Sequence, residues 1–229
     1  APASAAATIT GPMAGGGYDA TIALHGAFHG FKQTADGESE TVPPTASYSR
    51  TLAPGIRADA NYAFSGTPWS AGMDFRLIND VVNVGDKVHG FNNWSLMAGG
   101  RFHLSETSIG SPYVAAGIER TQTTIFQSTA TTPLAPATQT LVGVRVGGGL
   151  TLEPVSGIGL DVRLAELFAP YPIATILGAR ASKPIAGDFA IVGGLEADIK
   201  HIGLAVDGTP IQISDAQIGL YAGLTYASF

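Results

Sequence analysis

Apolar and polar side chains alternate with a period of two along most of this chain, and this pattern constrains the fold more than any other feature. In residues 18–31, Ala20, Ile22 and Leu24 share one face, whereas Asp19, Thr21 and His25 share the other. Successive side chains of a strand point to opposite sides, so the pattern predicts strands with one apolar and one polar face. No stretch approaches the roughly 18 consecutive apolar residues that a transmembrane helix needs. The sequence therefore predicts an all-β protein.

Ten segments carry this alternation, and each is predicted to be a strand. They comprise residues 18–31, 55–65, 69–78, 94–104, 113–126, 141–152, 158–167, 173–182, 189–200 and 217–229. The fifth and eighth alternate least clearly, so eight or twelve strands are the alternatives. In the fifth, adjacent Glu119 and Arg120 cannot both point to the polar side without a β-bulge.

The predicted connections fall into two classes that alternate along the chain. The short ones are residues 66–68, 105–112, 153–157 and 183–188, and the long, polar ones are residues 32–46 and onward, 79–93, 127–140 and 201–216. Only the short link at residues 168–172 breaks the order. In an up-and-down antiparallel arrangement, this alternation places all the long loops on one rim of the sheet.

The composition favours a membrane barrel over a soluble one. Apolar residues make up 45% of the chain and charged residues only 13%, about half the usual charged share of a soluble domain. The polar strand faces carry mainly arginine and aspartate among small residues, a mixture that suits bidentate pairing in a confined space. We therefore expect the apolar faces to point outward and the charged faces to line a narrow lumen.

The predicted lumen-lining residues are the charged and histidine side chains on the polar faces. The charged set is Asp19, Arg57, Asp59, Asp74, Arg76, Arg101, Arg145, Asp161, Arg163, Arg180, Glu196 and Asp198, and the histidines are His25, His29 and His103. His25 and His29 lie four residues apart, roughly 13 Å along a strand, too far to share one metal ion. No metal site, cofactor or catalytic residue is predicted.

The C-terminal segment carries a resemblance to a known class. It ends in Leu-Thr-Tyr-Ala-Ser-Phe, and a terminal Phe229 closing an alternating aromatic strand resembles the insertion signal of the small outer-membrane β-barrels of Gram-negative bacteria. That signal usually has an aromatic residue two positions before the terminal one, where this chain has Ala227 and places Tyr226 one residue further back. The resemblance covers about residues 17–229.

The resemblance implies a closed up-and-down antiparallel transmembrane β-barrel of about ten strands. It also implies an exported protein of the bacterial outer membrane, with both termini in the periplasm and outer-membrane lipid as its surroundings. Residues 1–16, which are rich in Ala, Gly and Thr, are expected to be a flexible leader left after removal of a signal peptide. Residues 17–229 form the barrel domain, and we expect a monomer.

Three kinds of function follow as alternatives. The first is a narrow, porin-like channel for ions or small solutes, selected by the charged lining. The second is a closed structural or surface-interaction barrel that meets an external ligand through its long loops. The third is an outer-membrane enzyme similar to the omptin proteases or to the lipid-modifying barrels. The net charge of −6 and the absence of a basic run exclude nucleic acid as an expected partner.

The enzyme alternative depends on the polar residues predicted for the loop rim. Omptin-like chemistry requires paired acids and a His–Asp couple at the external rim, and the candidates there are Asp80, Asp86, His89, His201 and Asp207. A lipid-modifying enzyme needs a Ser–His couple. Ser95 and His103 share a strand but lie eight residues apart, too far to touch. We therefore expect no enzyme.

Overall fold

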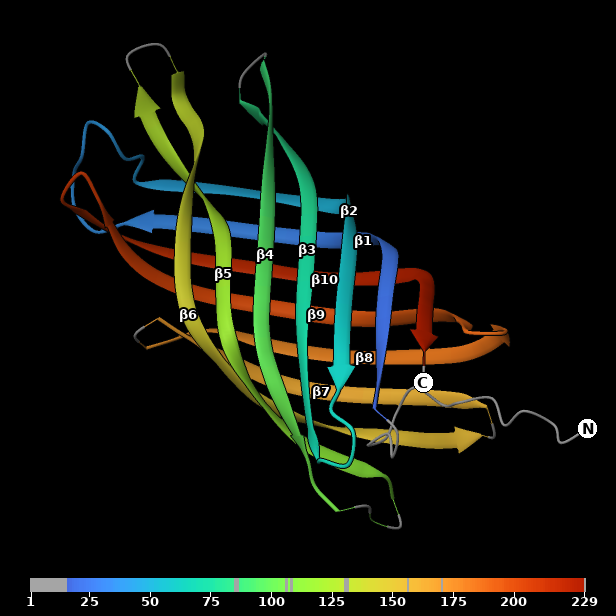
Figure 1. The fold of residues 1–229 in the computed structure, drawn as a ribbon. Coiled ribbons are helices and arrows are strands. Elements are labelled where there is room, and N and C mark those ends of the chain that lie inside the picture. Colours follow the sequence, from blue (N-terminus) through green and yellow to red (C-terminus); the bar gives the residue numbers. More distant parts are fainter. Residues whose placement is uncertain are drawn as a thin grey trace, which may run out of the picture.

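The computed structural model describes residues 16–84, 87–105, 107, 109–129, 132–155, 157–169 and 171–228, and these form one barrel of antiparallel strands (Figure 1). The strands are β1 (Gly17–Ala35), β2 (Thr45–Ala63), β3 (Trp69–Val84), β4 (Lys87–His103), β5 (Ser111–Thr129), β6 (Thr132–Val155), β7 (Ile158–Phe168), β8 (Pro172–Ala186), β9 (Phe189–Val206) and β10 (Thr209–Ser228). Within this described part, no helix is long and apolar enough to cross a membrane.

Each strand pairs with its neighbours in sequence, and β1 pairs with β10 to close the sheet. The closing register runs without interruption from Tyr18 opposite Ser228 to Ala35 opposite Ile211. We call the end at Tyr18 and Ser228 the termini-side end, and the end at the β9–β10 turn the loop-side end. The predicted closed, ten-stranded, up-and-down barrel is confirmed.

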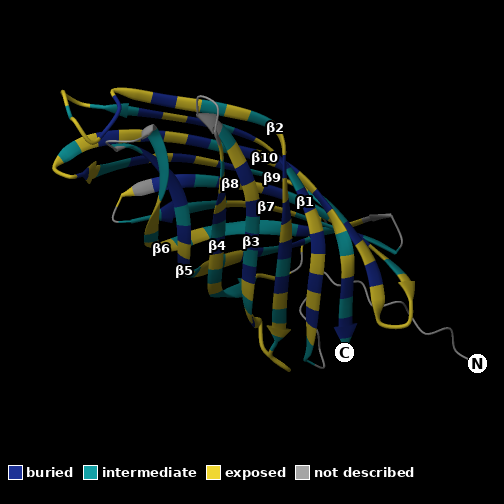
Figure 2. Ribbon diagram, turned by 90° about the horizontal axis from the view of Figure 1, so that it is seen from above, coloured by how far each residue is buried: buried dark blue, intermediate teal, exposed yellow. Residues whose placement is uncertain are grey.

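Burial follows the period-two pattern of the sequence, as the striped strands of Figure 2 show. On β1, Ile22 and Leu24 have 65% and 75% of their surface exposed, whereas Thr21 and Ala23, which alternate with them, are buried. The same division holds on β10, where Leu220 is exposed and Tyr221 is buried. The apolar faces therefore point outward, as expected, and the polar faces point into the barrel.

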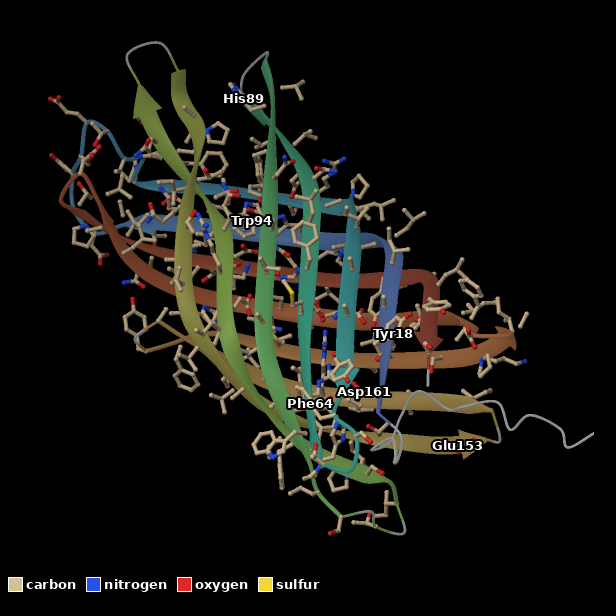
Figure 3. All side chains as sticks on the ribbon, viewed as in Figure 1. Tyr18, Phe64, His89, Trp94, Glu153 and Asp161 are labelled. Carbon is tan, nitrogen blue, oxygen red and sulfur yellow. The ribbon has the colours of Figure 1, made fainter. Side chains whose placement is uncertain are left out.

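Aromatic side chains gather on the outer surface near the termini-side end. Tyr226 of β10 lies against Tyr18 of β1 and Phe189 of β9, with ring centroids 5.9 and 5.3 Å apart. Trp69 of β3 packs edge-on against Phe102 of β4 at 4.8 Å. Figure 3 shows Tyr18 and Phe64 in this region, while His89 lies at the opposite tip and Trp94 lies between the two ends.

Residues 36–44 of the first predicted long loop do connect two strands, but the other three segments, residues 79–93, 127–140 and 201–216, are mainly strand where they are described, so their prediction as loops is wrong. They extend the paired strands into long hairpins, such as β9–β10, which turns at Asp207 and Gly208. Both turn residues have positive φ, 48° and 80°, and Asp-Gly is a strong signal for a two-residue hairpin turn. The flanking residues keep the alternation of strands, with Ile202, Val206 and Ile211 on one side. The polar residues of these segments made the period-two alternation difficult to detect in the sequence.

The bulge considered at Glu119 and Arg120 is not needed. The β5 register with β4 and with β6 is continuous there, with Glu119 pointing inward and Arg120 outward. A register shift occurs instead between β1 and β2, between Ala27 and His29. Because of this shift, even-numbered residues of β2 point inward up to Arg50, and odd-numbered residues point inward from Ala53 onward.

The predicted leader falls almost entirely outside the described residues, which begin at Gly16. Phe229, which carries the resemblance at the C-terminus, also lies outside them.

Two inward glycines make room for large interior side chains. A Cβ at Gly194 would lie 2.5 Å from the Tyr221 ring, and one at Gly219 would lie 2.2 Å from Nε2 of His25.

Candidate functional site

Glu196 of β9 is the centre of an ion-pair network inside the barrel. Arg57 of β2 donates from Nη1 to its Oε2 at 2.8 Å, and Arg76 of β3 donates from Nη1 to its Oε1 at 2.9 Å. Arg163 of β7 also donates to Oε2. None of these three strands neighbours β9 in the sheet, so the contacts cross the interior. One carboxylate thus joins β9 to the adjacent strands β2 and β3 and to β7.

Further carboxylates compensate the remaining charge of these arginines. Arg57 also donates to Asp74, and Arg76 also donates to Asp198. Lys200 Nζ lies 3.6 Å from an oxygen of the same Asp198. All five side chains are nearly inaccessible to solvent. Because buried charges are stable only when paired, the middle of the lumen is occupied by groups that satisfy one another.

Two further arginines pair with other carboxylates, one of which, Asp59, also lies 3.8 Å from Nε of Arg57. Arg145 of β6 lies 2.5 Å from Glu119 of β5, whose side chain is fully buried. Arg180 of β8 donates to Asp59 at 2.9 Å and to the hydroxyl oxygens of Thr21 and Thr225 at 2.7 and 3.0 Å. This second pair crosses from β8 to β1, β2 and β10, nearer the termini-side end.

A cavity of about 120 Å³ lies in the termini-side half of the lumen. Its lining includes Asp19, Asp161 and Arg101 as well as Arg57 and Arg163 of the network. Asp19 accepts from Asn61 at 3.1 Å, and Asp161 accepts from the Tyr113 hydroxyl at 3.2 Å. At the roughly 10–15 Å³ that one water requires, a cavity of this volume has room for several waters or a small solute.

Arg101 is the least committed charge of this cavity. Its guanidinium lies over the Tyr113 ring at 5.2 Å, and none of the described carboxylates is within ion-pair distance of it. Beside it, His103 shares a hydrogen bond with Ser70 at 3.3 Å, while its buried Nδ1 has no described partner. This wall of the cavity therefore offers a guanidinium and an imidazole nitrogen that are free to form hydrogen bonds with a solute.

His29 forms a second buried cluster nearer the loop-side end. Its Nδ1 is bound to Asp80 of β3 and its Nε2 lies 2.9 Å from Asp215 of β10. The Tyr48 hydroxyl lies 3.2 Å from Nδ1, and Arg50 donates to Asp80 at 3.3 Å. An imidazole between two carboxylates is suited to carry a proton on both nitrogens. The cluster links β1, β2, β3 and β10.

Apolar side chains fill the interior above this cluster, and we call them the loop-side apolar cluster. Its buried members are Phe31, Val42, Ala46, Ile125, Phe126, Leu167, Ile173, Ala174, Ile202, Val206, Ile211 and Ile213. They come from seven strands and from the β1–β2 connection. Most of them lie in segments that the sequence analysis took for polar loops or strand ends.

The structure places the predicted lumen residues as follows. Their side chains are buried or half-buried on the inward face of their strands: Asp19, Arg57, Asp59, Asp74, Arg76, Arg101, Arg145, Asp161, Arg163, Arg180, Glu196, Asp198, His25, His29 and His103. The three histidines have different surroundings: His29 binds Asp80 and Asp215, His103 shares a hydrogen bond with Ser70, and the ring of His25 lies 6.5 Å from the ring of Tyr221. Among the described residues, no group of three or more His, Asp or Glu could hold a metal ion.

Among the described rim candidates for catalysis, Asp80, His201 and Asp207 do not come together in one site. Asp80 was predicted in a loop, but it lies in β3 and is buried against His29. His201 lies in β9 with its Nδ1 3.4 Å from the Ser214 hydroxyl, and Asp207 lies in the β9–β10 turn. Asp86 is outside the described residues. The assignment of Asp80 and His201 to loops was wrong because the hairpins continue past the predicted strand ends.

Several interior residues were missed by the sequence analysis. Asp80 and Asp215 were assigned to loops, and Glu119 was left out of the lumen set because a bulge was expected next to it. Lys200 was on the polar face of its predicted strand, so its parity could have identified it. Tyr48 and Arg50 precede the β2 register shift, and no periodic signal could have assigned them to the interior.

No family model matches the chain, and no curated protein matches it in sequence. Solved structures do match it. The outer membrane protease OmpT from Escherichia coli aligns with a TM-score of 0.58 at 10% identity, covering 98% of this chain and 100% of that one. OprG from Pseudomonas aeruginosa aligns with a TM-score of 0.42 at 13% identity, covering 96% and 99%. At these identities the likeness concerns the fold alone, and the fold of this chain is that of the Gram-negative outer-membrane β-barrels.

Proposed function

We propose that this protein is a closed barrel of the bacterial outer membrane that acts through its loop-side rim. The observation that carries the proposal is the loop-side apolar cluster, in which side chains from seven strands pack inside the barrel. A close-packed apolar interior leaves no continuous path for hydrated solutes. The ion-pair network centred on Glu196 lies beneath it and also occupies the lumen.

The rim itself is held in place by the same cluster. In the β1–β2 connection, Val42 is buried in the cluster, and Thr41 accepts a hydrogen bond at its carbonyl from the Ser128 amide at 2.7 Å. The Asp36 amide donates to the Pro210 carbonyl at 2.9 Å, which ties this connection to β10. A preordered surface loses little conformational entropy when it binds a partner. This order favours recognition as the role of the rim.

The rim has a charge that indicates its partner. Asp36, Glu38 and Glu40 are exposed on the β1–β2 connection, and Asp207 is exposed at the adjoining β9–β10 turn. Complementary charge steers association and suppresses wrong partners. We therefore expect a cationic protein or peptide surface as the partner.

The closed lumen is tested by conductance. The purified protein in a planar bilayer should give no steady single-channel current across a range of salt concentrations. Steady current that changes in Arg76→Ala would instead support a channel. Arg76 is the appropriate probe because it lies in the middle of the lumen and binds both Glu196 and Asp198.

The rim is tested by neutralising its acids. Fluorescent polylysine should bind proteoliposomes of phosphatidylcholine that contain the protein, and binding should fall several-fold in Asp36→Asn/Glu38→Gln/Glu40→Gln. Asp188→Asn, at the termini-side turn, is the matched control and should bind as the original chain does. Equal binding by the rim variant and the control would reject the rim as the site of interaction.

A narrow channel is the second candidate, and the termini-side cavity favours it. Arg101 is a free donor there and the Nδ1 of His103 is free to form a hydrogen bond, which suits a small anionic or zwitterionic solute. Passage would require the loop-side apolar cluster to open. An enzyme similar to the protease neighbour has less support, because His29, the one histidine held by two acids among the described residues, has no exposed surface for a substrate.

A further inference from the structure

Arg120 is placed unlike the arginines of the lumen. Its neighbour Glu119 points inward and is fully buried, so Arg120 points outward and is exposed. Its cross-strand neighbours are Leu96 of β4 and Val142 of β6, which are also exposed. Arg120 therefore stands on the apolar outer wall of the barrel, where a charge without a partner is unfavourable.

The height of Arg120 on the wall is defined by these neighbours. Toward the loop-side end, Leu96 and Val142 are followed on the same faces by Asn92 and by Thr140, and the next exposed aliphatic residue of β4 is Val88, near the β3–β4 turn. Arg120 thus lies at the border between the apolar band and the polar rim. In a membrane-embedded barrel this border is the level of the lipid headgroups.

The side chain of Arg120 extends toward the polar side of that border. Its guanidinium lies over the ring of Trp94 at 5.4 Å, and Trp94 is two residues closer to the loop-side end of β4 than Leu96. None of the described carboxylates is paired with it. Arg120 and Trp94 together present a cation and an amphipathic ring at one point of the interface.

We propose that Arg120 and Trp94 form a binding site for the phosphate of an anionic lipid in the loop-side leaflet. The guanidinium matches phosphate geometry with two parallel N–H donors, and Leu96 and Val142 provide an apolar surface for the acyl chains beneath. A lipid fits better than a free anion because its phosphate can bind the guanidinium while its acyl chains cover the apolar surface of Leu96 and Val142. The site rests on the proposed location of the barrel in a membrane.

Tryptophan quenching tests this site directly. The chain has two tryptophans, so Trp69→Phe leaves Trp94 as the only one. The variant is reconstituted in phosphatidylcholine vesicles that contain equal fractions of either brominated phosphatidylcholine or brominated phosphatidic acid. The anionic lipid should bind next to Trp94 about fivefold more strongly, the order expected for one arginine at a charged lipid interface.

Variants of Arg120 assign the preference to its side chain. Arg120→Gln should reduce the ratio of the two lipid affinities to about one, and Arg120→Lys should keep most of it. The control is Trp94→Phe, in which Trp69 reports from the opposite end of the wall, and its ratio should not change on Arg120→Gln. Each variant is first checked for folding by its heat-modifiable migration in gels.

The outcomes separate this inference from the proposed function. Equal quenching of Trp94 by the two lipids would overturn the lipid-phosphate site and leave the membrane location standing. A preference that survives Arg120→Gln would overturn the site as well. Absence of quenching by both lipids would mean that the wall does not face lipid, and both proposals would fail.

Discussion

Gln33 of β1 and Phe126 of β5 exchange two hydrogen bonds across the inside of the barrel. The Gln33 amide nitrogen donates to the Phe126 carbonyl at 2.9 Å, and the Phe126 amide donates to Gln33 Oε1 at 2.9 Å. Gln33 has no exposed surface. The Gln33 side chain thereby binds both backbone groups of Phe126, although β1 and β5 are not neighbours in the sheet. It joins two walls of the barrel at the loop-side apolar cluster.

Gln33→Leu should destabilise the barrel by about 2–4 kcal/mol, because it leaves a buried amide and a buried carbonyl of Phe126 without partners. The free energy is measured by urea unfolding in detergent micelles, followed by tryptophan fluorescence. Lys32→Gln, at the exposed neighbouring position, should change it by less than about 0.5 kcal/mol. Similar values for the two variants would contradict a bracing role for Gln33.

Glu196→Gln should destabilise the fold by about 3–5 kcal/mol, the usual cost of breaking a buried ion pair from one side. The substitution keeps the size of the side chain and leaves Arg57, Arg76 and Arg163 without their shared carboxylate. The same unfolding measurement applies, with Glu40→Gln on the exposed β1–β2 connection as control. A loss below about 1 kcal/mol would show that water or other acids replace Glu196.

Gly219→Ala and Gly90→Ala should have opposite effects, although both glycines lie in strands. The new methyl group at residue 219 would lie 2.2 Å from His25 Nε2, whereas at residue 90 the nearest atom is 3.9 Å away. Overpacking should cost about 1–3 kcal/mol at residue 219, and Gly90→Ala should be neutral or stabilise by up to about 1 kcal/mol. Thermal unfolding of the two variants in parallel provides the measurement.

Gly208→Ala should destabilise the β9–β10 hairpin by about 1–2 kcal/mol, since residue 208 has a φ of 80° and side chains with a Cβ are strained in that region. Asp207→Asn should be tolerated, because asparagine also adopts positive φ readily. Amide hydrogen exchange across residues 202–213 should accelerate in the first variant alone. Unchanged exchange in Gly208→Ala would argue against the two-residue turn.

The sequence determined the strands and which of their faces points outward. Period-two alternation located all ten, and the pairing of arginine with aspartate among small residues predicted the charged side as the inner one. Both signals are local, because each depends only on neighbours one or two positions away. This is why they could be identified from residues such as Ile22 and Asp19 without any knowledge of distant contacts.

Tertiary structure decided how the interior is divided and where the hairpins end. Glu196 of β9 receives arginines from β2, β3 and β7, none of which neighbours β9 in the sheet, and His29 meets Asp80 and Asp215 only because the barrel closes between β1 and β10. The loop-side apolar cluster likewise draws on segments whose polar composition indicated loops. Parity indicates that a side chain points inward, but only the register and curvature of the closed sheet determine which other side chain it meets across the lumen.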